Sequence, residues 1–73
     1  MNSERERQIT VNGETRTWRG ASLRELLIEA GVDPDSGGLA VALNAHVVVR
    51  EHWATTAPKP GDKVEIVTVF KGG

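Results

Sequence analysis

The sequence predicts a single α+β domain in which a mixed sheet of four to five short strands wraps around one helix. Two observations predict it: one segment has apolar residues at helical spacing, and several short segments alternate between apolar and polar residues between turn residues. The chain has 73 residues. A chain this short buries only about 60% of the surface that it exposes when unfolded, so it has room for one core.

Residues 8–18 predict two antiparallel strands joined by a tight turn. Ile9 and Val11 alternate with polar residues before Asn12-Gly13, and the alternation resumes after these two residues. Asn-Gly between two alternating segments is the strongest short hairpin signal, because both turn positions need a positive φ. We therefore expect a hairpin at the start of the domain.

A helix is predicted to begin at about Leu23. Ser22 and Glu25 match a capping box, in which each side chain accepts a hydrogen bond from the other residue's backbone N–H. Gly31 and then Pro34 end the helix, the first as a left-handed cap and the second because it cannot continue a helix. The residues that repeat at helical spacing and form one apolar stripe are Leu23, Leu26, Leu27 and Ala30.

The following residues predict a second hairpin and a short helical turn. Residues 39–43 and 47–49 are rich in aliphatic side chains and flank residues 44–45, which we expect to form the turn. Residues 50–56 break the alternation, and they predict a helical turn that packs Trp53 against the sheet.

Residues 63–70 alternate again and predict the last strand. Val64, Ile66 and Phe70 are expected to face the helix, whereas Lys63, Glu65, Val67 and Val69 are expected to face away from it. Val67 and Val69 would then form a small exposed apolar patch. We expect these two valines, together with Lys71, to bind partner proteins. The alternative is that Val67 and Val69 are only strand-forming residues on a half-covered face of the sheet.

These elements, in this order, have one economical arrangement, which is the β-grasp or ubiquitin-like fold. The expected limits are a disordered, charged leader at residues 1–7 and a β-grasp domain at residues 8–70. Residues 71–73 are expected to form a flexible tail that ends in Gly-Gly.

Composition excludes several classes of function. The formal net charge of -1 gives no bulk attraction to nucleic acid or to an anionic membrane. No apolar run approaches the roughly 20 residues of a membrane-spanning helix. The absence of cysteine excludes a disulfide framework and a cysteine nucleophile, and His46 and His52 lack the spacing of a helical metal pair. We therefore expect a cytoplasmic protein that binds no metal, no nucleic acid and no membrane.

The chain contains no catalytic motif such as a GxxxxGK[ST] phosphate loop, GxSxG or HExxH. The reactive group that remains is the α-carboxylate of Gly73, which Gly72 and Gly73 present on the thinnest possible peptide. A carboxylate must be activated before a nucleophile can attack it, and condensation with ATP to an acyl-adenylate would activate it. The sequence offers no groups for Mg-ATP, so we expect a chain that binds no cofactor and is the substrate of an enzyme that uses ATP and Mg²⁺.

Several segments carry a resemblance to a known family. They are Val41–Asn44, Val47–Arg50, Trp53-Ala54, Gly61–Val67 and Gly72-Gly73. With these segments the chain resembles, from about Gln8 to its end, the ThiS family of ubiquitin-like sulfur carriers in bacterial thiamine biosynthesis. The run Gly-Asp-x-Val-Glu-Ile-Val followed by a terminal Gly-Gly is a fairly specific signal of this family.

The resemblance implies a function for the end of the chain. A ThiF-like enzyme would adenylate Gly73, and a sulfurtransferase or cysteine desulfurase would supply the sulfur that converts it to a thiocarboxylate. The thiocarboxylate would then give its sulfur to thiazole synthase, which builds the thiazole of thiamine. In this interpretation Gly73 carries the sulfur, Gly72 gives clearance, and the chain is a carrier rather than an enzyme and is a monomer when free.

Other functions share the same features. The small subunit of molybdopterin synthase resembles this chain in fold and in its terminal Gly-Gly, although residues 44–53 are more similar to ThiS. A ubiquitin-like protein modifier would use the same adenylate with an amine acceptor. A β-grasp nucleic-acid or regulatory module is disfavoured by the nearly neutral charge. Trp18 is bulkier than expected for the family, and we interpret it as a core residue rather than part of a docking face.

Overall fold

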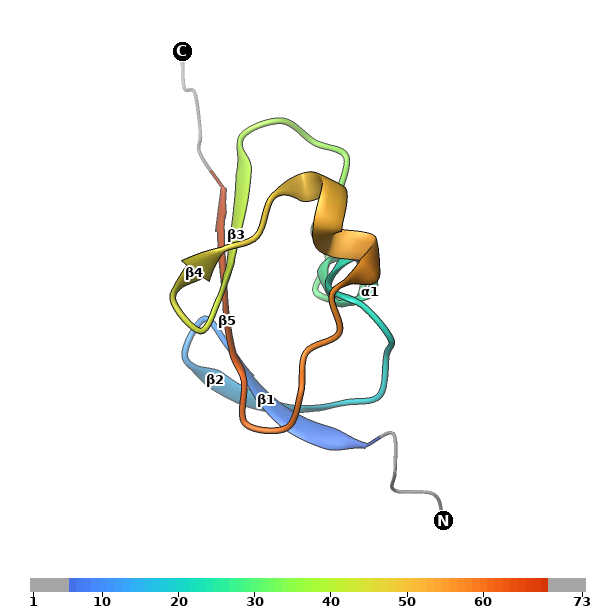
Figure 1. The fold of residues 1–73 in the computed structure, drawn as a ribbon, viewed down its shortest axis with the longest axis vertical. Helices are drawn as coiled ribbons and strands as arrows, with labels where there is room; N and C mark the ends of the chain where they lie inside the picture. Colours follow the sequence, from blue (N-terminus) through green and yellow to red (C-terminus); the bar gives the residue numbers. More distant parts are fainter. Residues whose placement is uncertain (1–5, 69–73) are drawn as a thin grey trace.

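A computed structural model of the chain describes residues 6–68, and Figure 1 shows how they are arranged. Its elements are β1 (Arg7–Val11), β2 (Glu14–Trp18), α1 (Leu23–Glu29), β3 (Leu39–Leu43), β4 (His46–Val47), the 3-10 helix η1 (Arg50–Thr55) and β5 (Lys63–Thr68). The strands form one mixed sheet in the order β2-β1-β5-β3-β4. β1 and β5 are parallel, whereas the other neighbouring strands are antiparallel. This sheet with its single α-helix confirms the predicted β-grasp fold.

The core lies between one face of the sheet and the helical segments α1 and η1, which lie on the same side of the sheet in Figure 1. Burial of one large apolar side chain contributes about 1.5–3 kcal/mol to folding. The leucines of the predicted stripe are fully buried, whereas Ala30 is partly exposed. The buried apolar residues of this part of the chain are Ile9, Val11, Trp18, Leu23, Leu26, Leu27, Val41, Trp53 and Val64.

The first hairpin has the predicted turn. Asn12 and Gly13 have φ values of 51° and 85°, and Val11 pairs with Glu14 across them. Positive φ at both central positions is typical of a type I′ turn, whose twist matches that of the flanking strands.

β1 begins at Arg7, one residue before the predicted start of the domain. The Arg7 guanidinium lies over the Trp18 ring, 4.8 Å from its centroid, and donates hydrogen bonds to the carbonyls of Pro58 (3.0 Å) and Gly20. The prediction that Arg7 belongs to a disordered leader is wrong, because stacking and hydrogen bonds order this charged side chain. Residues 1–5 of the predicted leader and the predicted tail at 71–73 lie outside the described residues.

The start of α1 has the predicted caps, with one shift. The Ser22 hydroxyl accepts a hydrogen bond from the Glu25 N–H (3.3 Å). The Glu25 carboxylate, however, accepts from the N–H of Ala21 (2.9 Å) and not from that of Ser22. The reciprocal part of the predicted capping box is therefore displaced by one residue.

Gly31 ends α1 as a left-handed cap, as predicted, with φ of 85°. Its N–H donates to the Ile28 carbonyl (3.0 Å), and the Val32 N–H donates to the Leu27 carbonyl (2.9 Å). These two hydrogen bonds are those of a Schellman motif, which satisfies carbonyl groups at the end of a helix.

The second hairpin has the predicted turn but a shorter second strand. Residues 44–45 have φ values of 52° and 72°, so they form a two-residue turn between β3 and β4. β4 contains only His46–Val47, and the prediction of a strand at residues 47–49 is wrong at its end. The Val48 N–H still donates to the Val41 carbonyl of β3 (2.9 Å). Val49 is the N-cap of η1, so the chain leaves the sheet at this residue.

η1 packs Trp53 into the core, as predicted. Trp53 is 2% exposed, and its indole N–H donates to the Val48 carbonyl (2.8 Å). The Arg50 guanidinium lies 4.7 Å from the centroid of the Trp53 ring and donates to the carbonyls of Pro34 and Ser36, the latter at 2.7 Å. Arg50 therefore joins η1 to the loop that follows α1.

An exposed ion pair also joins this loop to α1. Arg24 approaches the Asp35 carboxylate to 3.2 Å, and the hydrogen bond and the charge of Arg24 lower the pKa of Asp35. A lowered pKa means that any stabilisation by the pair is present at neutral pH and is lost as the pH falls through that pKa. Because both side chains are exposed, the pair contributes little to the free energy of unfolding.

Gly20 lies directly against Trp18. A Cβ atom at this position would be 2.5 Å and 2.8 Å from two atoms of the indole ring. Trp18 is 2% exposed, which confirms its interpretation as a core residue, and Arg7 covers its ring. The chain therefore needs glycine at position 20 for space.

We expect Gly20→Ala to lower the free energy of unfolding by about 1–3 kcal/mol, because the added methyl group overpacks Trp18. Gly37→Ala is the matched control, since a Cβ there has no atom within 4 Å, and it should change stability by less than about 0.5 kcal/mol. Urea unfolding followed by tryptophan fluorescence measures both variants. Equal stability of the two variants would mean that the Trp18 ring moves aside at no cost.

Candidate functional site at the end of β5 and on the open face

β5 is the central strand of the sheet and leads toward the end of the chain (Figure 1). The predicted modification site Gly73, the predicted clearance residue Gly72, and the predicted partner-binding residues Val69 and Lys71 all lie outside the described residues. Of the predicted site residues, the structure therefore places Val67.

Asn12, in the first hairpin turn, holds β5 on one edge. Its Oδ1 accepts a hydrogen bond from the Ile66 N–H (2.8 Å), and its Nδ2 donates to the Ile66 carbonyl (3.3 Å). The backbone pairing of β1 with β5 ends at Val11 and Val64. The Asn12 side chain thus continues this pairing for one more residue of β5.

Asn44, in the second hairpin turn, holds the start of β5 on the other edge. Its Oδ1 accepts from the Lys63 N–H (2.9 Å), and its own N–H donates to the Lys63 carbonyl (2.7 Å). The Asp62 carboxylate accepts from the Asn44 side-chain amide (3.0 Å) and from the Lys59 N–H (2.7 Å). Asparagine suits both turns because it tolerates a positive φ and also carries a donor and an acceptor.

The residues of β5 alternate between the core and the face of the sheet that lies away from α1, which we call the open face. Val64 is 1% exposed, whereas Val67 is 55% exposed. Glu65 pairs with Ala42 of β3, and Val67 pairs with Ala40. Val67 therefore lies on the open face, where the alternation predicts it.

A small apolar patch on the open face, the open-face patch, consists of Ala40, Ala42, Val47 and Val67. Ala42 pairs with Val47 of β4, and Ala40 pairs with Val67, so these side chains form two neighbouring cross-strand pairs. Val47 is 76% exposed. Val47 is not among the residues that the sequence pattern assigns to a site. The signal is the two-residue turn at 44–45, because such a turn places Val47 opposite Ala42.

Charged side chains border this patch. Lys63 and Glu65 are exposed and lie on the open face of the same strand. Within residues 6–68, no group of three or more His, Asp or Glu side chains could hold a metal ion. The helices of the same residues lack the length and the hydropathy of a membrane-spanning helix. The described part of the site thus has an apolar centre and charges of both signs at its rim, as many protein-binding surfaces do.

Comparisons with known proteins agree with this fold. The model of the ThiS family matches residues 9–73. A thiazole synthase from Paramagnetospirillum magneticum is 37% identical over 67 residues, which cover 90% of this chain but only 20% of that protein. The sulfur carrier protein ThiS of Thermus thermophilus is 35% identical over 65 residues, which cover 89% of this chain and 98% of that protein. The crystal structure of a thiamine biosynthesis protein (ThiS) from Geobacter metallireducens has a TM-score of 0.72 and 36% identity, and the match covers 90% of this chain and 99% of that chain.

We expect Asn12→Gly to loosen β5 without straining the turn, because glycine also adopts a positive φ. Loss of the two hydrogen bonds to Ile66 should lower the free energy of unfolding by about 1–2 kcal/mol. NMR measures the rate of amide hydrogen exchange at Ile66 and at Val67, whose N–H points toward β3. The increase in this rate at Ile66 should be at least about tenfold larger than the increase at Val67. The same acceleration at both amides would mean that Asn12 acts only on global stability.

Proposed function

This chain belongs to the ThiS family, and we propose that it carries sulfur for thiamine biosynthesis as a thiocarboxylate on the α-carboxyl group of Gly73. The family match includes the terminal Gly72 and Gly73. The observation that carries the proposal is the placement of β5, a central strand that is hydrogen-bonded on both edges and leads toward this glycine pair.

The carboxylate of Gly73 needs activation before sulfur can be added. In our proposal a ThiF-like enzyme binds Mg-ATP, and the carboxylate attacks the α-phosphorus, which releases pyrophosphate and forms an acyl-adenylate. The terminal sulfur of a persulfide on a sulfurtransferase or cysteine desulfurase then attacks the acyl carbon, AMP leaves, and an acyl disulfide forms. A thiol of a partner enzyme attacks the other sulfur of this acyl disulfide, which forms a disulfide with it and releases the thiocarboxylate. The resulting thiocarboxylate is ionised near neutral pH and is a good sulfur nucleophile.

The residues of this chain supply position and clearance for that chemistry. Gly72 and Gly73 have no Cβ atoms, so the end of the chain can enter a channel that is too narrow for other residues. Asn12 and Asn44 fix the strand from which this end emerges. The groups that bind Mg-ATP belong to the partner enzyme, and we assign no cofactor to the carrier itself.

Thiazole synthase is the proposed acceptor of the sulfur. The support is the thiazole synthase of Paramagnetospirillum magneticum, because one segment of that protein is similar to this chain. A carrier-like segment within a thiazole synthase fits a carrier and a synthase that work together. We place these reactions in the cytoplasm, where ATP is available for the activation step.

We propose that the activating enzyme docks on the open-face patch, and that Val69 and Lys71 extend this contact. Val47 and Val67 are the exposed valines of the patch, and burial of such side chains at the centre of an interface favours binding. Lys63 and Glu65 at the rim would affect the rate of encounter more than the affinity. The free carrier is a monomer in this proposal.

Deletion of Gly73, or addition of one alanine after it, should abolish thiocarboxylate formation. Either change moves the acyl carbon by about 3.5 Å relative to the reacting groups of the partner. The melting temperature should stay within about 2 °C, because the buried core lies between Ile9 and Val64. Intact-mass analysis after incubation with the activating enzyme, ATP and a sulfur donor detects the exchange of oxygen for sulfur. Normal sulfur loading of either variant would contradict the proposal.

Val67→Asp should weaken binding of the activating enzyme at least about tenfold and change the free energy of unfolding by less than about 0.5 kcal/mol. Gln8→Asp is the matched control, because Gln8 is also exposed on the open face but lies on β1, outside the patch. Titration calorimetry measures binding, and urea unfolding measures stability. A stability loss as large as the loss of affinity would assign Val67 to the packing of the domain.

A further inference from the structure

The free edge of the sheet at β2 is a second surface that differs from the open-face patch. β2 has β1 as its neighbour in the described sheet, and the two strands pair continuously from Arg7–Trp18 to Val11–Glu14 without a bulge. The other edge strand, β4, has only 2 residues. Long edges without proline or a bulge pair readily with another strand, and proteins usually protect them. β2 is therefore the edge of this sheet to which a strand can be added.

The register shows which backbone groups of β2 are free. Val11 and Glu14 flank a two-residue turn, so they form a hydrogen-bonded pair, and bonded and non-bonded pairs then alternate along the hairpin. The N–H and C=O groups of Thr15 and Thr17 consequently point away from β1. The hydrogen bond of Thr10, which lies opposite Thr15, agrees with this register. The Thr10 N–H points away from β2 and donates to the carbonyl of Asp62, the residue before β5 (3.0 Å).

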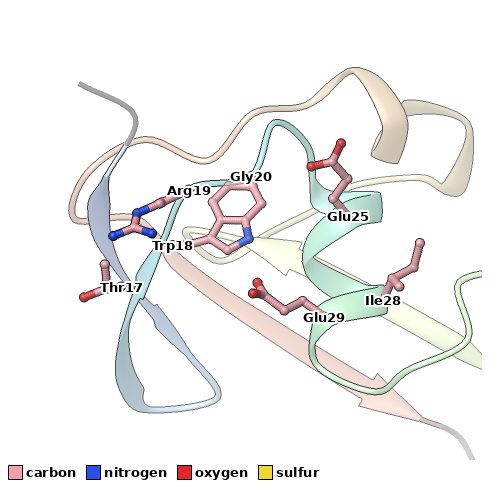
Figure 2. A pocket seen from close by; sticks show the side chains of 7 residues that line it. All are labelled: Thr17, Trp18, Arg19, Gly20, Glu25, Ile28 and Glu29. Atoms are coloured by element: carbon pink, nitrogen blue, oxygen red, sulfur yellow. The ribbon is translucent and has the colours of Figure 1, made fainter. Parts of the chain in front are cut away.

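A groove of about 540 Å³ lies beside this edge, between the end of β2 and α1 (Figure 2). Its lining residues are Thr17, Trp18, Arg19, Gly20, Glu25, Ile28 and Glu29. Trp18 is almost fully buried and closes the floor, whereas Ile28 on the helix is 56% exposed. A strand added to β2 would direct every second side chain toward α1 and thus into this groove.

The charges of the groove indicate the kind of side chain that fits it. Arg19 is already paired with Glu6 (2.9 Å), and the Glu25 carboxylate accepts a hydrogen bond from the Ala21 N–H. The carboxylate of Glu29 is exposed and has no hydrogen bond or ion pair to any of residues 6–68. A lysine or arginine of a partner is therefore complementary to Glu29.

We propose that β2 and this groove bind an extended segment of a partner protein, which adds to the sheet as a further strand. An apolar side chain of the segment packs against Ile28, and a lysine or arginine two residues away pairs with Glu29. Backbone hydrogen bonds to Thr15 and Thr17 supply affinity, and the two groove-facing side chains supply specificity. This site does not depend on the chemistry of Gly73.

Titration of the isotope-labelled full-length chain with a synthetic peptide tests this site by NMR. The probe is acetyl-Thr-Val-Thr-Ile-Thr-Lys-Thr-amide, and it should shift the amides of Thr15 and Thr17 and the methyl groups of Ile28. Thr17→Pro removes the N–H of the free edge and should weaken binding at least about tenfold, whereas Thr17→Ala keeps this N–H and should bind within about twofold of the unmodified chain.

A charge reversal tests the groove independently of the strand edge. Glu29→Lys should weaken binding of this peptide about two- to fivefold and should strengthen binding of the peptide with Glu in place of Lys. Glu51→Lys is the matched control, because Glu51 is exposed on η1, outside the groove. Equal effects of the two charge reversals, shifts confined to the open-face patch, or self-association of the chain through β2 would each overturn the proposal.

Discussion

β5 lies in the middle of the sheet, so its backbone has to be hydrogen-bonded on both edges. A central strand must satisfy its N–H and C=O groups on two sides, yet β1 pairs with β5 at only two positions, Thr10–Lys63 and Val11–Val64. Asn12 supplies the next pair of hydrogen bonds, and Asn44 closes the start of the strand on the other edge. Glycine would form either turn equally well, but it would leave the backbone of β5 without these partners.

A domain of this size also has few side chains with which to build a core, and two tryptophans fill much of it. Each tryptophan ring is covered by an arginine: Arg7 stacks on Trp18, and Arg50 stacks on Trp53. Each arginine also donates hydrogen bonds to the carbonyls of neighbouring loops. The arginines therefore shield the rings from water and join segments that have no regular secondary structure. In a larger protein, further apolar residues would cover the core at these places.

The features that the sequence predicts correctly depend on neighbouring residues. Asn12-Gly13 specifies its turn, and Gly31 specifies the end of α1, because each requires only a local backbone conformation. The features that it does not predict depend on residues far apart in the chain: Asn12 binds Ile66 across 54 positions. Trp18 of the neighbouring strand orders Arg7. The prediction of a disordered leader used only the charge of Arg7 and is therefore wrong at this residue. The place of Val47 in the open-face patch likewise follows from its register with β3 rather than from its neighbours.

The two proposed surfaces lie on different sides of the sheet, and this separation has a consequence for a carrier. The open-face patch lies on the side away from α1, whereas the groove beside β2 opens toward α1. A partner on the groove therefore leaves the patch accessible to an activating enzyme, and the two can bind the carrier at the same time. If the carboxyl group of Gly73 carries the sulfur, as we propose, it can react in only one active site at a time. In the function that we propose, access to Gly73 therefore sets the competition between the enzymes that process the carrier, and a partner bound at the edge of β2 does not take part in this competition.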